Sequence, residues 1–341
     1  MGAHKFLKHN KAIQTIKKMK AIVFDTVKKK LLVLLILYCL YHFINENDDD
    51  IAFADSLSPK TISIMAVGDS IGYNVDEKDL TNLDKIIQNN TDIFIFNLEG
   101  VLSKNPFPLN NINMLKECHG FPKYQSTFVT DYTFVDYLKL APITIANLAN
   151  NHIFDCDING IKETKKILME KDILSVGAGQ NLKEACEPLI IQSEEGLRIM
   201  FVSYNFVLKK LVSAQTNHAG GASIEGCKHD YNKMKLQNKA DIIIASIHLG
   251  YWSSHVSARQ IDVVQHLFDS GVDIVIGHSP HIPQAIQKTK TIEGEKLAFF
   301  SLGNFILKPD YVMPLEAHTT IVPKITIDTE NNIMNVTIYS V

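Results

Sequence analysis

The sequence lacks the short motifs by which several common enzyme classes are recognised. It has no glycine-rich phosphate loop, because the GAG of residues 177–179 fits neither the dinucleotide nor the P-loop pattern, and it has no G-x-S-x-G nucleophile elbow. None of its five cysteines belongs to a C-x-x-C pair, which argues against a cysteine-built zinc site. Repeats and low-complexity tracts are absent. Nucleotide-binding and serine-hydrolase functions are therefore disfavoured.

Composition and charge distribution exclude further classes of protein. The 341 residues are 46% hydrophobic and 21% charged, which excludes a disordered, collagen-like or multi-span membrane chain and suggests one large or two smaller domains. Residues 1–30 hold nine lysines against Asp25 alone, a charge of +8, so the other 311 residues carry −11 of the total of −3. This acidic body argues against nucleic acid as a partner.

Residues 31–44, LLVLLILYCLYHFI, form one apolar run between the basic segment 1–30 and the acidic residues 45–50. This charge order predicts a single-pass protein of the cell membrane with a cytoplasmic N-terminus and an extracytoplasmic body. Fourteen helical residues rise about 21 Å, short of a hydrocarbon core of about 30 Å, and snorkelling lysines make up part of the difference. We favour a retained anchor. A signal peptide cleaved after Ala52–Ala54 and a buried soluble helix are the alternatives.

Strand-like and helix-like segments alternate from Thr61 onward, after a predicted linker at 45–60. This alternation predicts an α/β layered fold. The tail, residues 324–341, contains two alternating strands around residues 330–332, which predicts a hairpin and therefore a mixed sheet. In residues 206–240 the hydrophobic residues follow neither the helical nor the strand period, so no element is predicted there.

Polar side chains recur directly after the apolar strands. In α/β sheets ligands bind at the carboxyl ends of strands, so we expect these residues to form a site. Carboxylates, imidazoles and amides without thiolates suit one or two ions of Mn, Fe or Zn. The residues in question are Asp69, Asn97, Glu99, Asn151, His152, His248, His278, His281 and Asn304.

The cysteines leave two interpretations open. Cys39 lies in the apolar run, and the other four, Cys118, Cys156, Cys186 and Cys227, lie in the body. These four can form up to two disulfides if the body is exported. We favour buried free thiols, because free cysteine commonly behaves as a small buried hydrophobe.

Four blocks of sequence, NLEG, ANNH, GHSPH and SLGNF, occur in this order between residues 62 and 308. In this combination the chain resembles the CapA family of poly-γ-glutamate capsule biosynthesis proteins, which is similar in fold to the calcineurin-like metallophosphoesterases. The resemblance implies a four-layer α/β/β/α sandwich of two mixed sheets over residues 61–310. Residues 311–341, with the C-terminal hairpin, would complete this domain.

The resemblance also implies roles for single residues. Asp69 and His152 would be catalytic, and Asn97, Asn304 and Trp252 would contact substrate. The sequence departs from the related patterns in lacking a D-x-H histidine after Asp69, in having Glu99 in place of aspartate, and in having Trp252 where the family usually has glutamate. The implied metal ligands are Asp69, Glu99, Asn151, His248, His278 and His281.

The function that the resemblance implies is that of a capsule biosynthesis protein with a metal-dependent hydrolase site, acting on an exported polymer or a phosphoester. Its partners would be an anionic cell-surface polymer such as poly-γ-glutamate, the membrane and other capsule-synthesis subunits. The alternative is a non-catalytic, membrane-anchored component of a polymer synthesis or export complex. The missing D-x-H histidine and Trp252 favour this alternative, whereas four histidines at strand ends favour the hydrolase.

Overall fold

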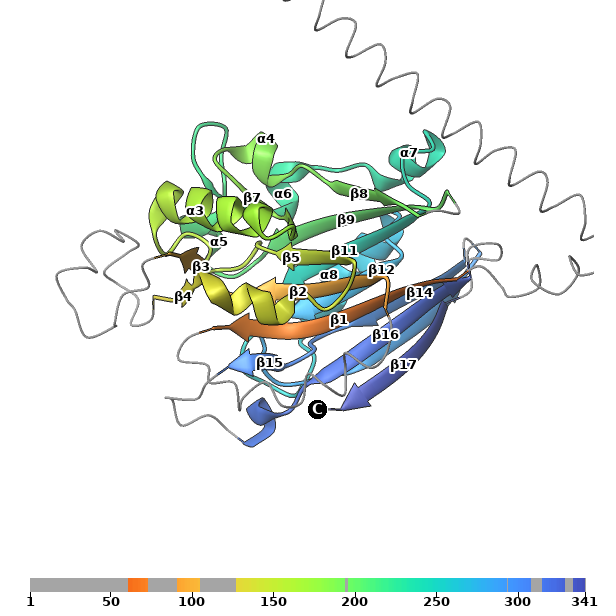
Figure 1. The fold of residues 1–341 in the computed structure, drawn as a ribbon. Coiled ribbons are helices and arrows are strands. Elements are labelled where there is room, and N and C mark those ends of the chain that lie inside the picture. The colour runs from red at the N-terminus through yellow and green to blue at the C-terminus, as the bar shows by residue number, and fades with distance from the viewer. Residues whose placement is uncertain are drawn as a thin grey trace, which may run out of the picture. The chain divides into compact units, whose positions relative to one another are not determined.

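Two mixed β-sheets form the centre of the fold (Figure 1). The computed structural model describes residues 61–72, 91–104, 127–193, 196–292, 294–307, 315–328 and 334–340. The predicted basic segment 1–30, the apolar run 31–44 and the linker 45–60 lie outside these ranges. Within them, no helix combines the length and the apolar character needed to cross a membrane.

The first sheet has seven strands, and the parallel ones direct their carboxyl ends to the same edge. The neighbours β1, β2, β5 and β6 are parallel, β15 pairs parallel with the end of β1, and the antiparallel strands β16 and β17 extend the other side. In spatial order the strands are β17 (Met334–Ser340), β16 (Ile321–Asp328), β1 (Thr61–Ile71), β2 (Ile93–Leu98), β5 (Ile143–Asn147) and β6 (Leu174–Val176), with β15 (Asn304–Leu307) beside β1.

The second sheet has six strands and is also mixed. Its four central strands are parallel, and each edge strand is antiparallel to its neighbour. In spatial order the strands are β13 (Ile286–Thr291), β14 (Gly294–Phe299), β12 (Ile274–His278), β11 (Ile242–His248), β9 (Arg198–Asn205) and β8 (Leu189–Gln192). The prediction of an α/β fold with two mixed sheets is confirmed.

The apolar runs in the sequence form strands because both of their faces are covered. β2 (IFIFNL) and β11 (IIIASIH) are buried at every residue, as expected for strands with protein on both sides. Between the sheets lies a core rich in isoleucine, to which Ile64 and Ile95 contribute from the first sheet and Ile244 and Ile276 from the second. The sheets therefore pack face to face.

Helices cover the outer faces of the two sheets. On the first sheet, α3 (Asp157–Glu170) and the 3-10 helix η2 (Tyr132–Leu138) share a core with β1, β2 and β5. On the second sheet, α8 (Ala258–Asp269) shares a core with β9, β11 and β12. The helix α8 begins with a capping box, in which the side chains of Ser257 and Gln260 each bond the other's backbone N–H.

Residues 206–240 fold into short elements, which explains why no period is readable there. This part contains α5 (Lys209–Val212), β10 (Gly220–Gly221), α6 (Ile224–Cys227) and α7 (Tyr231–Leu236). β10 pairs with β7 (Ala178–Gly179), which precedes α4 (Leu182–Ala185). The remaining elements are the parallel pair β3 (Val101–Ser103) and β4 (Val129–Asp131) and the 3-10 helix η3 (Leu315–His318).

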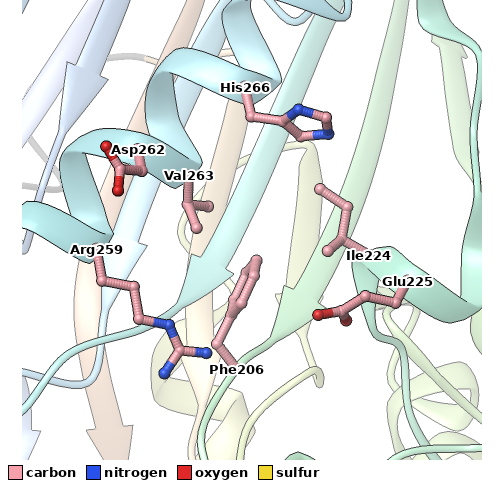
Figure 2. Close-up of a pocket in the computed structure, with 7 residues that line it drawn as sticks. All are labelled: Phe206, Ile224, Glu225, Arg259, Asp262, Val263 and His266. Carbon is pink, nitrogen blue, oxygen red and sulfur yellow. The ribbon is translucent and has the colours of Figure 1, made fainter.

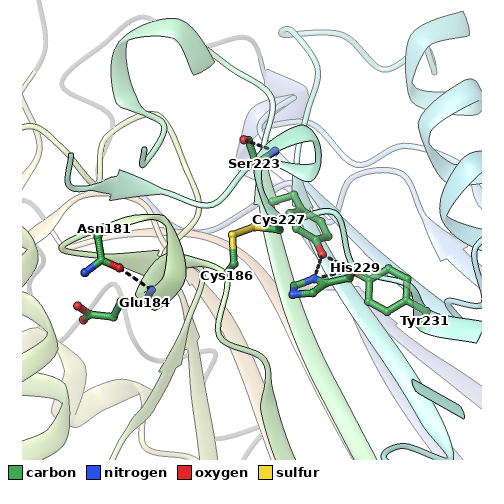
Figure 3. The surroundings of a disulfide bond; sticks show 9 residues. Asn181, Glu184, Cys186, Ser223, Cys227, His229 and Tyr231 are labelled. Carbon is green, nitrogen blue, oxygen red and sulfur yellow. Dashed lines mark hydrogen bonds between the residues drawn. A yellow bond between two sulfur atoms is a disulfide. The ribbon is translucent and has the colours of Figure 1, made fainter. Parts of the chain in front are cut away.

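The expectation of free buried thiols is wrong for three of the cysteines. Cys186, directly after α4, is disulfide-bonded to Cys227 at the end of α6, with the two Cα atoms 5.3 Å apart (Figure 3). Cys156 is disulfide-bonded as well. The pairing of Cys186 depends on how the segment after β9 folds back against α4, and spacing along the chain does not reveal this contact. Next to the disulfide, the Tyr204 hydroxyl lies 2.6 Å from Nδ1 of His229.

Candidate metal centre

Parallel strands from both sheets end at one place. Asp69 lies near the end of β1, Glu99 directly follows β2, and His248 and His278 end β11 and β12, where they are register partners. One ligand atom from each of Asp69, Glu99 and His248 lies within 4.8 Å of the other two. We call Asp69, Glu99, His248, His278 and His281 the strand-end cluster. The structure brings these five side chains together at the strand ends.

Asp69 is fully buried, and both of its carboxylate oxygens have protein donors. Oδ1 accepts a hydrogen bond of 2.6 Å from Nδ2 of Asn97, and Oδ2 accepts one of 3.1 Å from the backbone N–H of Ser279. Nδ1 of His281 lies 3.3 Å from Oδ2, and Nδ1 of His278 lies 3.6 Å from Oδ1. Burial raises the pKa of Asp69, but the imidazoles around it, His281 foremost, lower it below its ordinary value.

One carboxylate oxygen of Glu99 faces three imidazoles. Its Oε1 lies 3.7 Å from Nε2 of His248, 3.8 Å from that of His281 and 4.0 Å from that of His152. Its Oε2 is buried and has no hydrogen-bond partner among the residues that the structure describes. Burial, followed by the charge of Asp69, raises the pKa of Glu99 well above its ordinary value. A cation at this place would favour the ionised carboxylate instead.

The residues of the cluster fit a divalent cation. Besides Oε2 of Glu99, both ring nitrogens of His278 are buried and have no hydrogen-bond partner within the described part of the chain. Buried polar atoms normally have one. Burial lowers the pKa of His278 to about 4 and that of His248 to about 3, so both rings are neutral, the form that binds metals. Lone pairs on oxygen and nitrogen without thiolates suit Mn, Fe or Zn.

The loop after β12 presents His281 in a constrained backbone conformation. Ser279 has φ 96° and His281 has φ 57°, values that L-residues adopt only when the surroundings enforce them and that cluster at functional sites. Nδ1 of His281 lies 2.8 Å from Oδ1 of Asn304, whose Nδ2 donates to the carbonyl of Ala317. The Trp252 ring lies 5.2 Å from the His281 ring and is 49% exposed. The Trp252 side chain is therefore open to solvent beside the cluster.

His152 is held by a carboxylate that sequence reasoning did not single out. Its Nδ1 lies 2.8 Å from Oδ2 of Asp155, which also accepts the backbone N–H of Phe128 at 2.7 Å. The ring centres of Phe128 and His152 are 4.1 Å apart. Burial lowers the pKa of His152, but the hydrogen bond and charge of Asp155, with Glu99, raise it above its ordinary value. The ring is therefore biased toward carrying a proton next to the cluster.

The three asparagines predicted to belong to the site differ in burial and in hydrogen bonding. Asn97 and Asn304, predicted to contact substrate, are buried, and their amide groups are bonded to protein. Asn151, predicted to bind metal, is half-buried, and within the described part of the chain no hydrogen bond joins its side chain to the cluster. Its neighbour Asn150 points inward instead, with Nδ2 2.7 Å from the carbonyl of Leu98.

A separate pocket of about 210 Å³ lies between α6 and α8 (Figure 2). It contains none of the residues predicted from the sequence, and its wall combines apolar side chains with charges of both signs. The pocket is lined by Phe206, Ile224, Glu225, Arg259, Asp262, Val263 and His266. One of its walls, α6, ends at the disulfide-bonded Cys227.

The chain is similar to bacterial capsule synthesis proteins. Residues 58–309 match the family described as bacterial capsule synthesis protein PGA_cap. The capsule biosynthesis protein CapA of Bacillus anthracis is 31% identical over 177 residues, which are 50% of this chain and 42% of that protein. The PGA biosynthesis protein CapA of Bacillus subtilis (strain 168) is 28% identical over 178 residues, 52% of this chain and 46% of that protein. The chain thus spans less than half the length of these relatives.

A solved structure shares the fold. The crystal structure of a phosphatase from Mycoplasma pneumoniae superposes with a TM-score of 0.50 and 12% sequence identity, covering 83% of this chain and 94% of that one. At this identity the likeness shows a common fold and nothing about substrate. It agrees with the two-sheet sandwich that the family resemblance implies.

Proposed function

Because the chain belongs to the bacterial capsule synthesis protein family PGA_cap, we propose that it serves the synthesis of a bacterial surface polymer and that its strand-end cluster is a metal-dependent hydrolytic site. One observation carries the second part. Among the described residues, the buried Oε2 of Glu99 and the two ring nitrogens of His278 have no hydrogen-bond partner. They belong to a cluster that also contains Asp69 and His248. Poly-γ-glutamate, the polymer implied by the PGA in the name of the Bacillus subtilis relative, is the proposed polymer.

The strand-end cluster would hold one or two divalent ions of Mn, Fe or Zn, with Asn151 as a further predicted ligand. When bound, such an ion supplies Lewis acidity, which polarises a phosphoryl or carbonyl oxygen and lowers the pKa of water. The protein supplies neutral imidazoles from His248 and His278 and carboxylate oxygens from Asp69 and Glu99. These groups are preorganised, since each is buried and fixed at the end of a strand.

His152 is the proposed proton donor. Asp155 is close to its Nδ1, so Nε2 is the nitrogen that faces Glu99 and the cluster. A raised pKa keeps the ring protonated in a larger fraction of molecules, and a positioned imidazolium can protonate the leaving group of a phosphoester or an amide. Trp252, half-exposed beside His281, is the proposed substrate contact at the mouth of the site.

We further propose that residues 31–44 anchor the chain in the cell membrane, with residues 1–30 in the cytoplasm and the body outside. The charge order around the apolar run supports this orientation. The disulfide between Cys186 and Cys227 supports it independently, because disulfides persist in oxidising compartments and are rare in the cytosol. Anionic lipids, the polymer and other capsule-synthesis subunits are the proposed partners.

The second candidate function is a non-catalytic component of a polymer synthesis or export complex. Trp252 favours it, because this chain has tryptophan at the position where the family resemblance implies a glutamate. In this case the strand-end cluster would hold a structural ion or bind polymer carboxylates. The two functions differ in whether the cluster turns over a substrate.

His281→Ala tests the proposed function, with His266→Ala as the matched control because His266 is an exposed histidine on α8, away from the cluster. We would measure polymer yield, protein level, membrane localisation and complex composition in cells. Loss of polymer only in His281→Ala, with the protein and its complex intact, supports the hydrolase. Unchanged polymer contradicts it. Hydrolysis of bis(p-nitrophenyl) phosphate and of γ-glutamyl p-nitroanilide by the purified full-length chain then distinguishes the two classes of bond.

A further inference from the structure

Two buried glutamines, Gln260 and Gln284, form a hydrogen-bonded chain that ends at the loop of residues 250–256. This loop follows β11 and carries Trp252, so we call it the Trp252 loop. We propose that Gln284 is a positioning residue: its side-chain amide fixes the Trp252 loop so that Trp252 stays beside His281. The inference deepens the proposed function and rests on it only where turnover is measured.

The first step is the orientation of the Gln260 side chain on α8. Its Oε1 accepts the backbone N–H of Ser257 at 3.0 Å and the hydroxyl of the same residue at 2.9 Å. A backbone N–H can only donate, so the atom that faces it is the amide oxygen. The NH₂ group of Gln260 therefore points the other way, where it donates to Oε1 of Gln284 at 2.8 Å.

Gln284 continues this chain to the Trp252 loop. Because its Oε1 accepts from Gln260, its NH₂ group faces the loop, where it donates to the carbonyls of Ser253 at 2.8 Å and His255 at 3.0 Å. A carbonyl can only accept, so both contacts require this orientation of the amide. The backbone N–H of Gln284 donates to the carbonyl of Ser301 at 3.0 Å. With its amide engaged by protein at both ends, Gln284 orients other groups and does not touch substrate.

The segment that carries His281 also holds the beginning of the Trp252 loop. The hydroxyl of Ser279 donates to the carbonyl of Gly250 at 3.0 Å. Gly250 has φ 131°, and a Cβ built there would lie 2.7 Å from Cγ of Pro280, so glycine is needed for this close approach. Residues 279–284 therefore contact the loop at its beginning through Ser279 and near its end through the buried amide.

Hydrogen bonds hold this loop more than the burial of its aromatic side chains does. The Trp252 side chain is 49% exposed and that of Tyr251 is 81% exposed, and loops with few buried apolar contacts open easily. The ring centre of Trp252 nevertheless lies 5.2 Å from that of His281. The two bonds donated by Gln284 account for this placement. A substrate contact that is fixed in advance loses less conformational entropy on binding.

Gln284→Met tests the proposal, because methionine is unbranched like glutamine and cannot donate to the loop carbonyls. Gln287→Met is the matched control, since Gln287 lies on β13 and its amide donates to Thr289 of the same strand. Trp252 is the only tryptophan of the chain, so the intrinsic fluorescence of the full-length protein reports on this loop directly. We would measure acrylamide quenching and steady-state anisotropy of this fluorescence without added metal.

A released loop exposes the Trp252 ring further and lets it move on the nanosecond timescale. Because the ring is already 49% exposed, we expect quenching to rise by up to about twofold in Gln284→Met, with a lower anisotropy. We expect wild-type values in Gln287→Met. Equal quenching and anisotropy in Gln284→Met and wild type would overturn the proposal, as would an equal change in both variants.

Gln284→Glu serves if Gln284→Met does not fold. The introduced carboxylate keeps the acceptor for the NH₂ group of Gln260, but at pH 8 it is ionised and has no hydrogen to donate to the carbonyls of Ser253 and His255. We expect the same rise in quenching and the same fall in anisotropy, and wild-type values would equally overturn the proposal. Circular dichroism of each variant checks that the fold is kept.

Kinetics distinguish positioning from a merely structural role. If Trp252 contacts substrate, a released loop weakens binding of the ground state and of the transition state alike. We therefore expect KM for bis(p-nitrophenyl) phosphate or γ-glutamyl p-nitroanilide to rise several-fold in Gln284→Met with kcat unchanged. A fall in kcat at unchanged KM would overturn the proposal. If wild type hydrolyses neither substrate but quenching rises in Gln284→Met, the proposed hydrolase fails and the positioning role stands.

Discussion

Removing the disulfide between Cys186 and Cys227 tests a contact on which both the fold and the proposed location depend. The two cysteines are 41 residues apart. In the chain-entropy model, closing a loop of this length restricts the unfolded state enough to stabilise the folded protein by about 4 kcal/mol. We therefore expect Cys186→Ser, Cys227→Ser and the double variant to lose about 4 kcal/mol each in the free energy of unfolding.

The assay is urea unfolding of the oxidised full-length chain, followed by tryptophan fluorescence and circular dichroism. Each single substitution breaks the same bond, so the losses in the two single variants and in the double variant should be equal. Additive losses would instead show two independent thiols. A loss below about 1 kcal/mol, well under the range typical of a disulfide, would refute the reasoning, as would titration of both thiols in the unfolded wild-type protein.

Three further changes probe the site and its supports. Asp155→Asn withdraws the charge that orients His152, so turnover should fall about 10-fold or more with the metal content unchanged; equal kinetics would contradict the proton-donor role. Asp273→Ala removes the acceptor of the buried Ile243 backbone N–H and of the partly exposed Lys235 ammonium and should cost about 1–3 kcal/mol in urea unfolding; a loss near zero would contradict this. Gly277→Ala places a Cβ 2.1 Å from a backbone carbonyl oxygen and should cost about 1–3 kcal/mol by thermal unfolding, whereas wild-type stability would refute the close packing.

The parts of the fold that the sequence predicts are those in which local pattern and burial agree. β2 and β11 are buried on both faces, so their apolar runs are continuous and their ends are marked by Asn97 and His248. The rule that ligand sites lie at strand carboxyl ends then brings Asp69, Glu99 and His278 together without knowledge of the strand order. In the structure β11 and β12 are parallel, and their register pairs His248 with His278.

The supporting residues are not predictable in this way. In ANLANNH, strand position alone does not say which of Asn147, Asn150 and Asn151 turns inward, because that depends on Ser203 from the other sheet and on backbone donors in the loop. Asp155 reaches His152 only after the chain has turned into α3. Contacts between distant segments decide these details, and no local period encodes them.

Residues 206–240 are hard to predict for a related reason. Their helices, α5, α6 and α7, have four to six residues, which is too short for a helical period to be recognised. Part of their stability comes instead from the disulfide of Cys227 and from the contact between Tyr204 and His229. The cysteine pairing follows from this arrangement and not from spacing.

The metal content of the purified full-length chain tests the central claim most directly. Elemental analysis would compare wild type with the double variant His278→Ala plus His281→Ala, each after reconstitution with Mn, Fe or Zn. We expect one or two equivalents of one of these metals in wild type and their loss in the double variant. No stoichiometric metal in wild type, or equal metal in both proteins, would contradict a metal-dependent site at the strand-end cluster.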